Sequence, residues 1–173
     1  MRLDGTGYVE VNDSTAFNPS ITGFTAEAWI KPASTSYQSY IINKNDGSSN
    51  SFSIFTQSEY ISDRQLYNVV YSLIISANGC RPYSLENQQT YEKDTQVTSW
   101  HHIAAVIQPG GKLDLFVDGK ASTSNFNSIT STCGNSNSIQ IGARLLGAND
   151  AGGFFEGEID EVRISNVSRY PSN

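Results

Sequence analysis

The sequence predicts an all-β domain in which two antiparallel sheets pack face to face. Three observations predict it: segments in which apolar and polar residues alternate, turn sequences between them, and many uncharged polar residues. Hydrophobic residues make up 38% of the 173 residues and charged residues only 16%. This composition suits strands joined by polar turns, because helix surfaces favour Ala, Leu, Glu and Lys. A chain of this length can form one domain with a substantial core.

Alternation with a period of two marks the strands, because successive side chains of a strand point to opposite faces. In residues 24–31, the apolar set Phe24, Ala26, Ala28 and Ile30 shares one face, and Thr25, Glu27, Trp29 and Lys31 share the other. We expect further strands at residues 8–11, 40–43, 51–56, 67–76, 100–107, 113–117, 139–141 and 158–164. Asp118-Gly119 follows one of them and predicts a hairpin, since glycine tolerates positive φ. About ten short strands predict two packed sheets.

Two aromatic positions and a pair of histidines stand out in these strands. Trp29 and Trp100 are large apolar side chains, and we expect them to fill the space between the sheets. His101 and His102 are adjacent in a predicted strand, so their rings should point to opposite faces and cannot share one metal ion. Both histidines are therefore interpreted as structural positions.

The last predicted strand contains an irregularity. Ile159, Val162 and Ile164 all fit core positions, although Ile159 and Val162 are three residues apart. A β-bulge at Asp160-Glu161 would reconcile them and would re-aim the carboxylate of Asp160.

Charge and cysteine content narrow the possible partners and the compartment. The net charge is -6 and no cluster of Lys and Arg is present, which argues against nucleic-acid binding. No run approaches the ~18 apolar residues of a membrane-spanning helix, so we expect no membrane insertion. Cys80 and Cys133 both lie in polar, turn-like segments, which favours a disulfide and an oxidising compartment over two free thiols.

Three ordered segments carry a family resemblance. They are residues 3–9 (LDGTGYV) with 24–32 (FTAEAWIKP), residues 100–106 (WHHIAAV) with 113–120 (LDLFVDGK), and residues 141–143 (IGA) with 155–164 (FEGEIDEVRI). Together they resemble the concanavalin A-like lectin/glucanase superfamily, and within it the laminin-G-like (LamG) domains. The resemblance implies a two-sheet antiparallel jelly-roll sandwich over residues 1–165, followed by a C-terminal exit segment at residues 166–173.

The resemblance also raises the question of a metal. Many relatives hold one calcium ion between the first and last strands, and the matching positions here are Asp4 and Asp160. Calcium takes several oxygen ligands from carboxylates and backbone carbonyls, so a structural site of this kind would tie the chain ends together. In the alternative interpretation, Asp4 only starts a turn and Asp160 pairs with a backbone amide or with Arg163.

A catalytic role is not expected. Glu158-Ile159-Asp160 is similar to the Glu-Ile-Asp-x-Glu pattern of retaining endo-glucanases with this fold, which need two carboxylic acids. The second glutamate is missing here, because the next residue on the same face is Val162 and position 163 is Arg. A glycoside hydrolase is therefore the least favoured hypothesis, and we expect that the protein is not an enzyme.

The function that the sequence favours is carbohydrate binding or adhesion, as a module of a secreted or cell-surface multidomain protein. The chain has nine tyrosines, and several gather in its middle region, where aromatic faces could pack against sugar rings. The candidate ligand-binding residues are Tyr60, Tyr67, Tyr71 and Tyr83. The alternative is a structural spacer that binds another protein or nothing.

Overall fold

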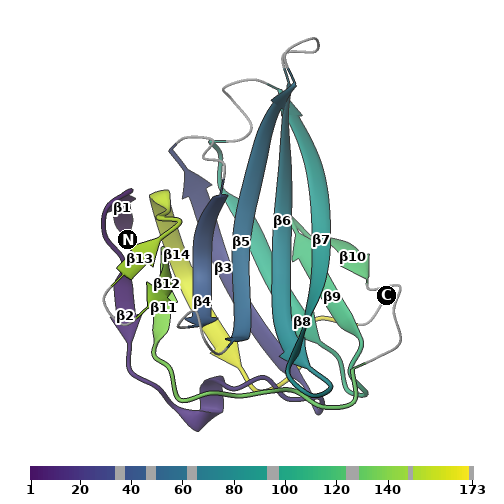
Figure 1. Ribbon diagram of the computed structural model, residues 1–173. Coiled ribbons are helices and arrows are strands. Elements are labelled where there is room, and N and C mark those ends of the chain that lie inside the picture. Colours follow the sequence, from purple (N-terminus) through teal and green to yellow (C-terminus); the bar gives the residue numbers. More distant parts are fainter. Residues whose placement is uncertain are drawn as a thin grey trace.

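Two six-stranded antiparallel sheets face each other in the computed structural model, which describes residues 1–33, 38–45, 50–61, 66–92, 98–123, 129–147 and 150–171 (Figure 1). Sheet A has the order β1 (Arg2–Asp4), β14 (Glu156–Ser165), β3 (Phe24–Pro32), β8 (His101–Ile107), β9 (Leu113–Val117) and β10 (Lys120–Thr123). Sheet B has the order β2 (Val9–Val11), β11 (Ile139–Ile141), β4 (Gln38–Asn45), β5 (Asn50–Ile61), β6 (Leu66–Ala77) and β7 (Arg81–Glu92). The predicted two-sheet sandwich is confirmed.

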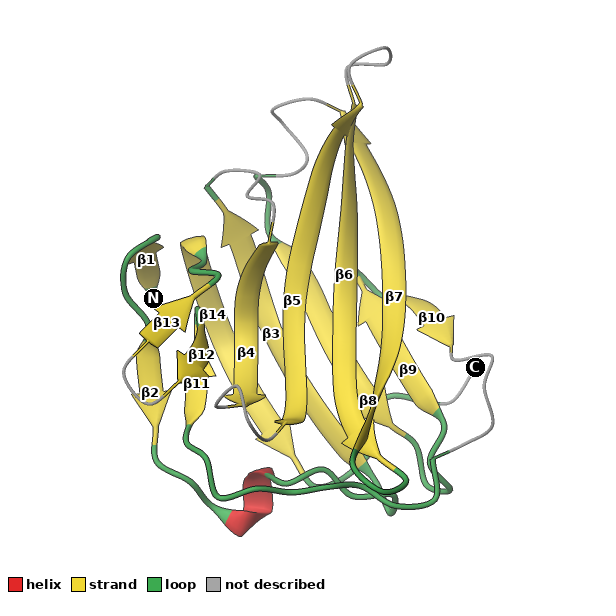
Figure 2. Ribbon diagram, viewed as in Figure 1, coloured by secondary structure: helices red, strands yellow, loops and turns green. Residues whose placement is uncertain are grey.

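Little else is regular in the described residues. A short hairpin pairs β12 (Arg144–Gly147) with β13 (Asp150–Gly152), and the only helix is the 3-10 turn η1 (Thr15–Phe17) among the loops at one end of the sandwich (Figure 2). Within these ranges no helix has the length and apolar character needed to cross a membrane.

The core lies between the sheets and follows the predicted alternation. Phe24, Ala26, Ala28 and Ile30 of β3 are all at most 2% exposed and belong to one apolar cluster. Sheet B contributes its own inward set to that cluster, which includes Ile42, Phe52, Ile54, Leu73 and Ile75. Burying one such aliphatic or phenylalanine side chain contributes roughly 1.5–3 kcal/mol, so this cluster holds the sandwich together.

The structure confirms nine predicted strands and adds others. The expected segments correspond to β2, β3, β4, β5, β6, β8, β9, β11 and β14, with β5 reaching further than expected. Asp118 and Gly119 have φ values of 49° and 78° and close the predicted hairpin between β9 and β10. β7 has no counterpart among the strands that the sequence predicts. This edge strand has few inward apolar residues, and its buried Asn87 instead donates hydrogen bonds to the carbonyls of Leu115 and Lys120 in sheet A, at 3.2 and 3.0 Å.

The predicted disulfide is confirmed. Cys80 and Cys133 form a bond with a Cα–Cα distance of 5.5 Å. Cys80 lies in the turn between β6 and β7, and Cys133 lies in the long segment that leads to β11. A backbone bridge between Ala77 and Thr132 runs beside the bond. The disulfide therefore ties the edge hairpin of sheet B to the connection that leads to β11.

Candidate functional site

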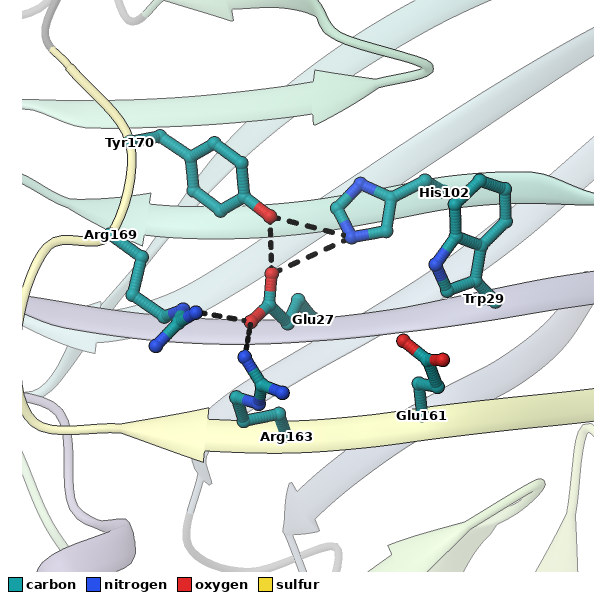
Figure 3. A pocket seen from close by; sticks show the side chains of 7 residues that line it. All are labelled: Glu27, Trp29, His102, Glu161, Arg163, Arg169 and Tyr170. Atoms are coloured by element: carbon teal, nitrogen blue, oxygen red, sulfur yellow. Dashed lines mark hydrogen bonds and ion pairs between the residues drawn. The ribbon is translucent and has the colours of Figure 1, made fainter.

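The outward side chains of three neighbouring strands of sheet A form the candidate site. In β3 the residues that alternate with the core set, including Glu27 and Trp29, point away from sheet B (Figure 3). In the adjacent strands, His102 of β8 lies opposite Trp29, and Arg163 of β14 lies opposite Glu27. Antiparallel partners on one face are close neighbours, so these side chains gather in one place.

The predicted bulge in β14 adds carboxylates to this face. Asp160 pairs with Trp29 and Arg163 pairs with Glu27, so three steps along β14 oppose two along β3. Glu161 has a φ of 48°, the left-handed conformation that lets the extra residue fit. Val162 packs against the core, while Asp160 and Glu161 are both exposed. The bulge prediction is confirmed.

Glu27 is the centre of a buried polar cluster. It is 6% exposed, and a buried carboxylate is stable only when it is paired. Its Oε1 lies 3.1 Å from Arg169 Nε and 3.6 Å from Arg163 Nη1. Its Oε2 accepts a hydrogen bond from the Tyr170 hydroxyl and lies 3.5 Å from His102 Nε2 (Figure 3). Side chains from β8, from β14 and from the segment after β14 thus contact the one carboxylate that β3 provides.

The segment after β14 packs back onto sheet A. The Tyr170 ring lies 5.1 Å from the Phe116 ring and covers a small apolar cluster on the outer face. The Thr25 hydroxyl donates to the Val167 carbonyl at 2.9 Å and accepts from the Arg169 amide at 3.1 Å. Residues 167–170 of the predicted C-terminal exit segment therefore contact the outer face of sheet A, and the boundary expected at residue 165 stays a prediction.

Tyr170 should titrate late in an alkaline titration. Burial raises the pKa of Tyr170 to about 12, and the hydrogen bond and charge of Glu27 add to this. Because the folded pKa lies above the usual 10.0, the stability linked to this group is complete below pH 10 and is lost as pH rises towards 12. Ultraviolet difference absorbance should show a late-ionising component that is smaller by one tyrosine in Tyr170→Phe. Identical titration curves for the two proteins would contradict this placement.

Both tryptophans of the chain lie on this outer face, not in the core. Trp29 is 39% exposed and Trp100 is 40% exposed. Together with Asp160 and Glu161 they line a depression of about 320 Å³. The Trp29 ring lies 5.2 Å from that of His102. The prediction that both indoles fill the core is wrong, because the alternation of β3 turns Trp29 away from sheet B and Trp100 precedes β8.

A second depression adjoins the first. It also has a volume of about 320 Å³, and it is lined by Glu27, Trp29, His102, Glu161, Arg163, Arg169 and Tyr170 (Figure 3). Trp29 and Glu161 line both hollows. We call the side chains that line the two depressions the Trp29 face. It combines exposed aromatic surface, carboxylates that accept hydrogen bonds, and guanidinium groups that donate them.

The two histidines have the opposite orientations that the sequence predicts. His101 is 4% exposed, and its Nδ1 lies 2.7 Å from Asp118 Oδ2 at the hairpin. His102 belongs to the Trp29 face. Glu158, the residue compared with glucanase carboxylates, lies 3.4 Å from Lys31 in a half-exposed ion pair.

Asp4 and Asp160 lie at different positions along the edge of sheet A. Asp4 lies opposite Glu156, four residues along β14 from Asp160, which corresponds to about 13 Å of strand. Asp4 Oδ1 accepts hydrogen bonds from the Thr6 amide and hydroxyl at 3.0 and 2.7 Å, and these lower the pKa of Asp4. Asp160 Oδ1 accepts from the Glu161 amide at 2.9 Å. In the described part of the chain, no group of three or more His, Cys, Asp or Glu residues is placed to hold a metal. Calcium binding stays a prediction.

The four predicted tyrosines belong to sheet B, on the other side of the sandwich. Tyr60 is 42% exposed, and in the register of β5 and β6 it lies opposite Tyr67, whose side chain is outside the described part. Tyr83 is half-buried, and its hydroxyl accepts a hydrogen bond from Asn78 at 3.1 Å. Tyr71 is 1% exposed and belongs to the core. Of the three tyrosine side chains that the structure describes here, Tyr60 alone is exposed.

Comparisons with known proteins agree with this architecture. A family model described as the concanavalin A-like lectin/glucanases superfamily matches residues 3–173. No curated protein matches the sequence. Similar solved structures include domains LG4-5 of the mouse laminin alpha1 chain, with a TM-score of 0.56 and 14% identity over 95% of this chain. The match spans 40% of that laminin chain.

Two further structures are similar over 98% of this chain. A heptameric SAP-like pentraxin from Limulus polyphemus has a TM-score of 0.63 and 17% identity over 76% of its own chain. The CBM40 of the Ruminococcus gnavus IT-sialidase, solved with alpha2,3 sialyllactose, has a TM-score of 0.64 and 12% identity over 91% of its own chain. At these identities the likeness establishes the fold alone. The family match covers nearly the whole sequence, and the chain therefore belongs to the concanavalin A-like lectin/glucanases superfamily as a laminin-G-like domain.

Proposed function

We propose that this domain is a non-catalytic recognition module that binds carbohydrate on the Trp29 face. One observation carries the proposal: both tryptophans of the chain are exposed beside Asp160 and Glu161 at the same depression. Sugar rings present apolar C–H faces that pack on indoles, and their hydroxyl groups donate to carboxylates. Small-molecule sites are usually lined by aromatic and apolar side chains together with a few polar groups that point to the ligand.

The exposure of the two indoles is the unusual feature. A single exposed hydrophobic side chain is ordinary on a protein surface. Here the two largest aromatic side chains share one depression with two carboxylates, on the outer face of the sheet. His102 lies beside the Trp29 indole, at 5.2 Å between ring centroids, and so supports its position. A supported aromatic surface needs little ordering when a ligand binds, which favours affinity.

The similar structures favour the same class of function. The Ruminococcus gnavus CBM40 was solved with sialyllactose, and a botulinum neurotoxin DC binding domain was solved in complex with SialylT. Laminin-G-like neighbours and the disulfide favour a secreted or cell-surface location within a larger protein. For this chain, sugar binding and that location are proposals.

A glycan array tests the proposed function. The wild-type domain is expected to bind a subset of plant, algal, bacterial or host glycans, and Trp100→Ala should weaken every hit. The array is run with calcium and again after chelation, with the melting temperature measured in both conditions. A fall in melting temperature on chelation would favour the predicted calcium ion, and no change would reject it. A blank array in both conditions would favour the alternative of a structural or protein-binding spacer.

A further inference from the structure

The charges of the Trp29 face are divided into two regions. Asp160 and Glu161 lie at the depression that contains both tryptophans. Arg163 and Arg169 line the adjoining depression together with Glu161, and in the close-up view both arginines lie around Glu27, whereas Glu161 lies below Trp29 (Figure 3). A ligand that spans both depressions would meet carboxylates at one end and guanidinium groups at the other.

Glu27 holds the two guanidinium groups in place without using up their donors. A guanidinium has five N–H donors, and Glu27 Oε1 contacts one nitrogen of each, at 3.1 Å for Arg169 and 3.6 Å for Arg163. The two arginine side chains are 41% and 52% exposed, whereas that of Glu27 is 7% exposed. The remaining donors are therefore accessible from solvent, while the carboxylate that orients them is not.

The separation of the charges favours an anion at the arginine end of the adjoining depression. Two arginines share the buried carboxylate of Glu27. Glu161 also lines this depression, so the formal charges of its lining residues sum to zero, but Glu161 lies beside Trp29 and the guanidinium groups lie around Glu27 (Figure 3). The planar guanidinium group matches a carboxylate or sulfate group with paired, charge-assisted hydrogen bonds. Because both groups are already oriented, binding an anion loses less side-chain freedom than it would at free arginines.

We propose that the glycan bound on the Trp29 face carries an anionic group, and that Arg163 and Arg169 bind this group while Trp29 and Trp100 pack against the neighbouring neutral sugar. The inference rests on the proposed function and names its ligand class. A carboxylate of a sialic or uronic acid and a sulfate ester supply the same charge chemistry. The two sources differ in the probes that detect them.

Calorimetric titration with matched pairs of probes tests the inference. The pairs are 3′-sialyllactose with lactose, a glucuronate-terminated oligosaccharide with its glucose counterpart, and a sulfated lactose with lactose. At least one acidic probe is expected to bind about tenfold or more tightly than its neutral partner, and added salt should weaken that preference. Preference for the sialyl or uronyl probe identifies a carboxylate, and preference for the sulfated probe identifies a sulfate ester.

Variants show whether the arginine pair is the cause. The double variant Arg163→Gln with Arg169→Gln should lose the preference for the acidic probe and keep its affinity for the neutral one. The double variant Arg163→Lys with Arg169→Lys keeps both positive charges and should retain part of the preference for the acidic probe. It therefore distinguishes loss of the charges from loss of the fold. Arg81→Gln, an equal charge change at an exposed position on sheet B, should leave the preference unchanged. Melting curves accompany each variant.

Two outcomes would overturn the inference, and they can be told apart. Equal binding of acidic and neutral probes, with loss on Trp100→Ala, would remove the anion subsite and leave the carbohydrate-binding function standing. If both double variants still bind the acidic probe more tightly than the neutral one, the anionic group binds at residues other than Arg163 and Arg169. Absence of binding to every probe would overturn the inference and the proposed function together.

Discussion

Trp29→Ala is expected to weaken glycan binding by about thirtyfold or more. Trp29 lines both depressions of the site, so its indole can contact a ligand in either one. Truncating a central aromatic contact typically costs about 2 kcal/mol or more of binding free energy, which corresponds to that factor. Titration calorimetry with the strongest hit of the glycan array measures the change, and a melting curve checks that the variant is folded.

Tyr60→Ala is the matched control for this prediction. Tyr60 is 42% exposed, close to the 39% of Trp29, but it lies on β5 of sheet B. It is also one of the residues that the sequence analysis selected as a ligand contact. If the Trp29 face is the site, Tyr60→Ala should bind as the wild type does. Lost binding in Tyr60→Ala with unchanged binding in Trp29→Ala would move the site to sheet B.

Replacing Cys80 and Cys133 together by serine is expected to lower the free energy of unfolding by about 4 kcal/mol. The disulfide spans 53 residues of sequence, and closing a loop of that length removes conformational entropy from the unfolded chain. For a domain of this size, a loss of about 4 kcal/mol lowers the melting temperature by roughly 8–16 °C. Denaturant unfolding and melting curves of the oxidised wild type and the double variant measure both quantities.

The same loss should appear when the wild-type disulfide is reduced. Adding a reductant should lower the melting temperature of the wild type to nearly that of Cys80→Ser with Cys133→Ser, and it should not affect the double variant. An oxidised wild type no more stable than the double variant would show that the bond does not constrain the fold. The bond lies away from the Trp29 face, so glycan affinity of the folded double variant should be unchanged.

Local patterns in the sequence predict most of the fold. The alternation of β3 separates its core set from its outer set, and the spacing of Ile159 and Val162 reveals the bulge in β14. These local patterns predict the structure correctly because the strand backbone makes successive side chains point to opposite faces. β7 was missed because its buried Asn87 is satisfied by carbonyls of sheet A, a long-range contact that leaves no local pattern.

The candidate site was less predictable from the sequence than the fold. The position of Trp29 could still have been inferred from the alternation of β3. The alternation of β3 already placed Trp29 opposite the core set, but the size of the indole suggested burial. The cluster around Glu27 depends on Arg169 and Tyr170, which lie in a polar segment that looks like an exit into a linker. Contacts between segments so far apart in sequence follow from the folded structure and not from spacing.

The indole signals of Trp29 and Trp100 in a nitrogen–proton correlation spectrum report whether a glycan binds on the Trp29 face. The chain contains two tryptophans, so the spectrum has two indole resonances, and Trp100→Phe assigns them. On titration with an acidic glycan that binds the domain, both resonances are expected to shift to saturation together with the amides of Asp160 and Glu161. Saturating shifts confined to sheet B residues such as Gln57 and Asn68, with both indole signals unmoved, would show that the glycan binds on sheet B and not on the Trp29 face.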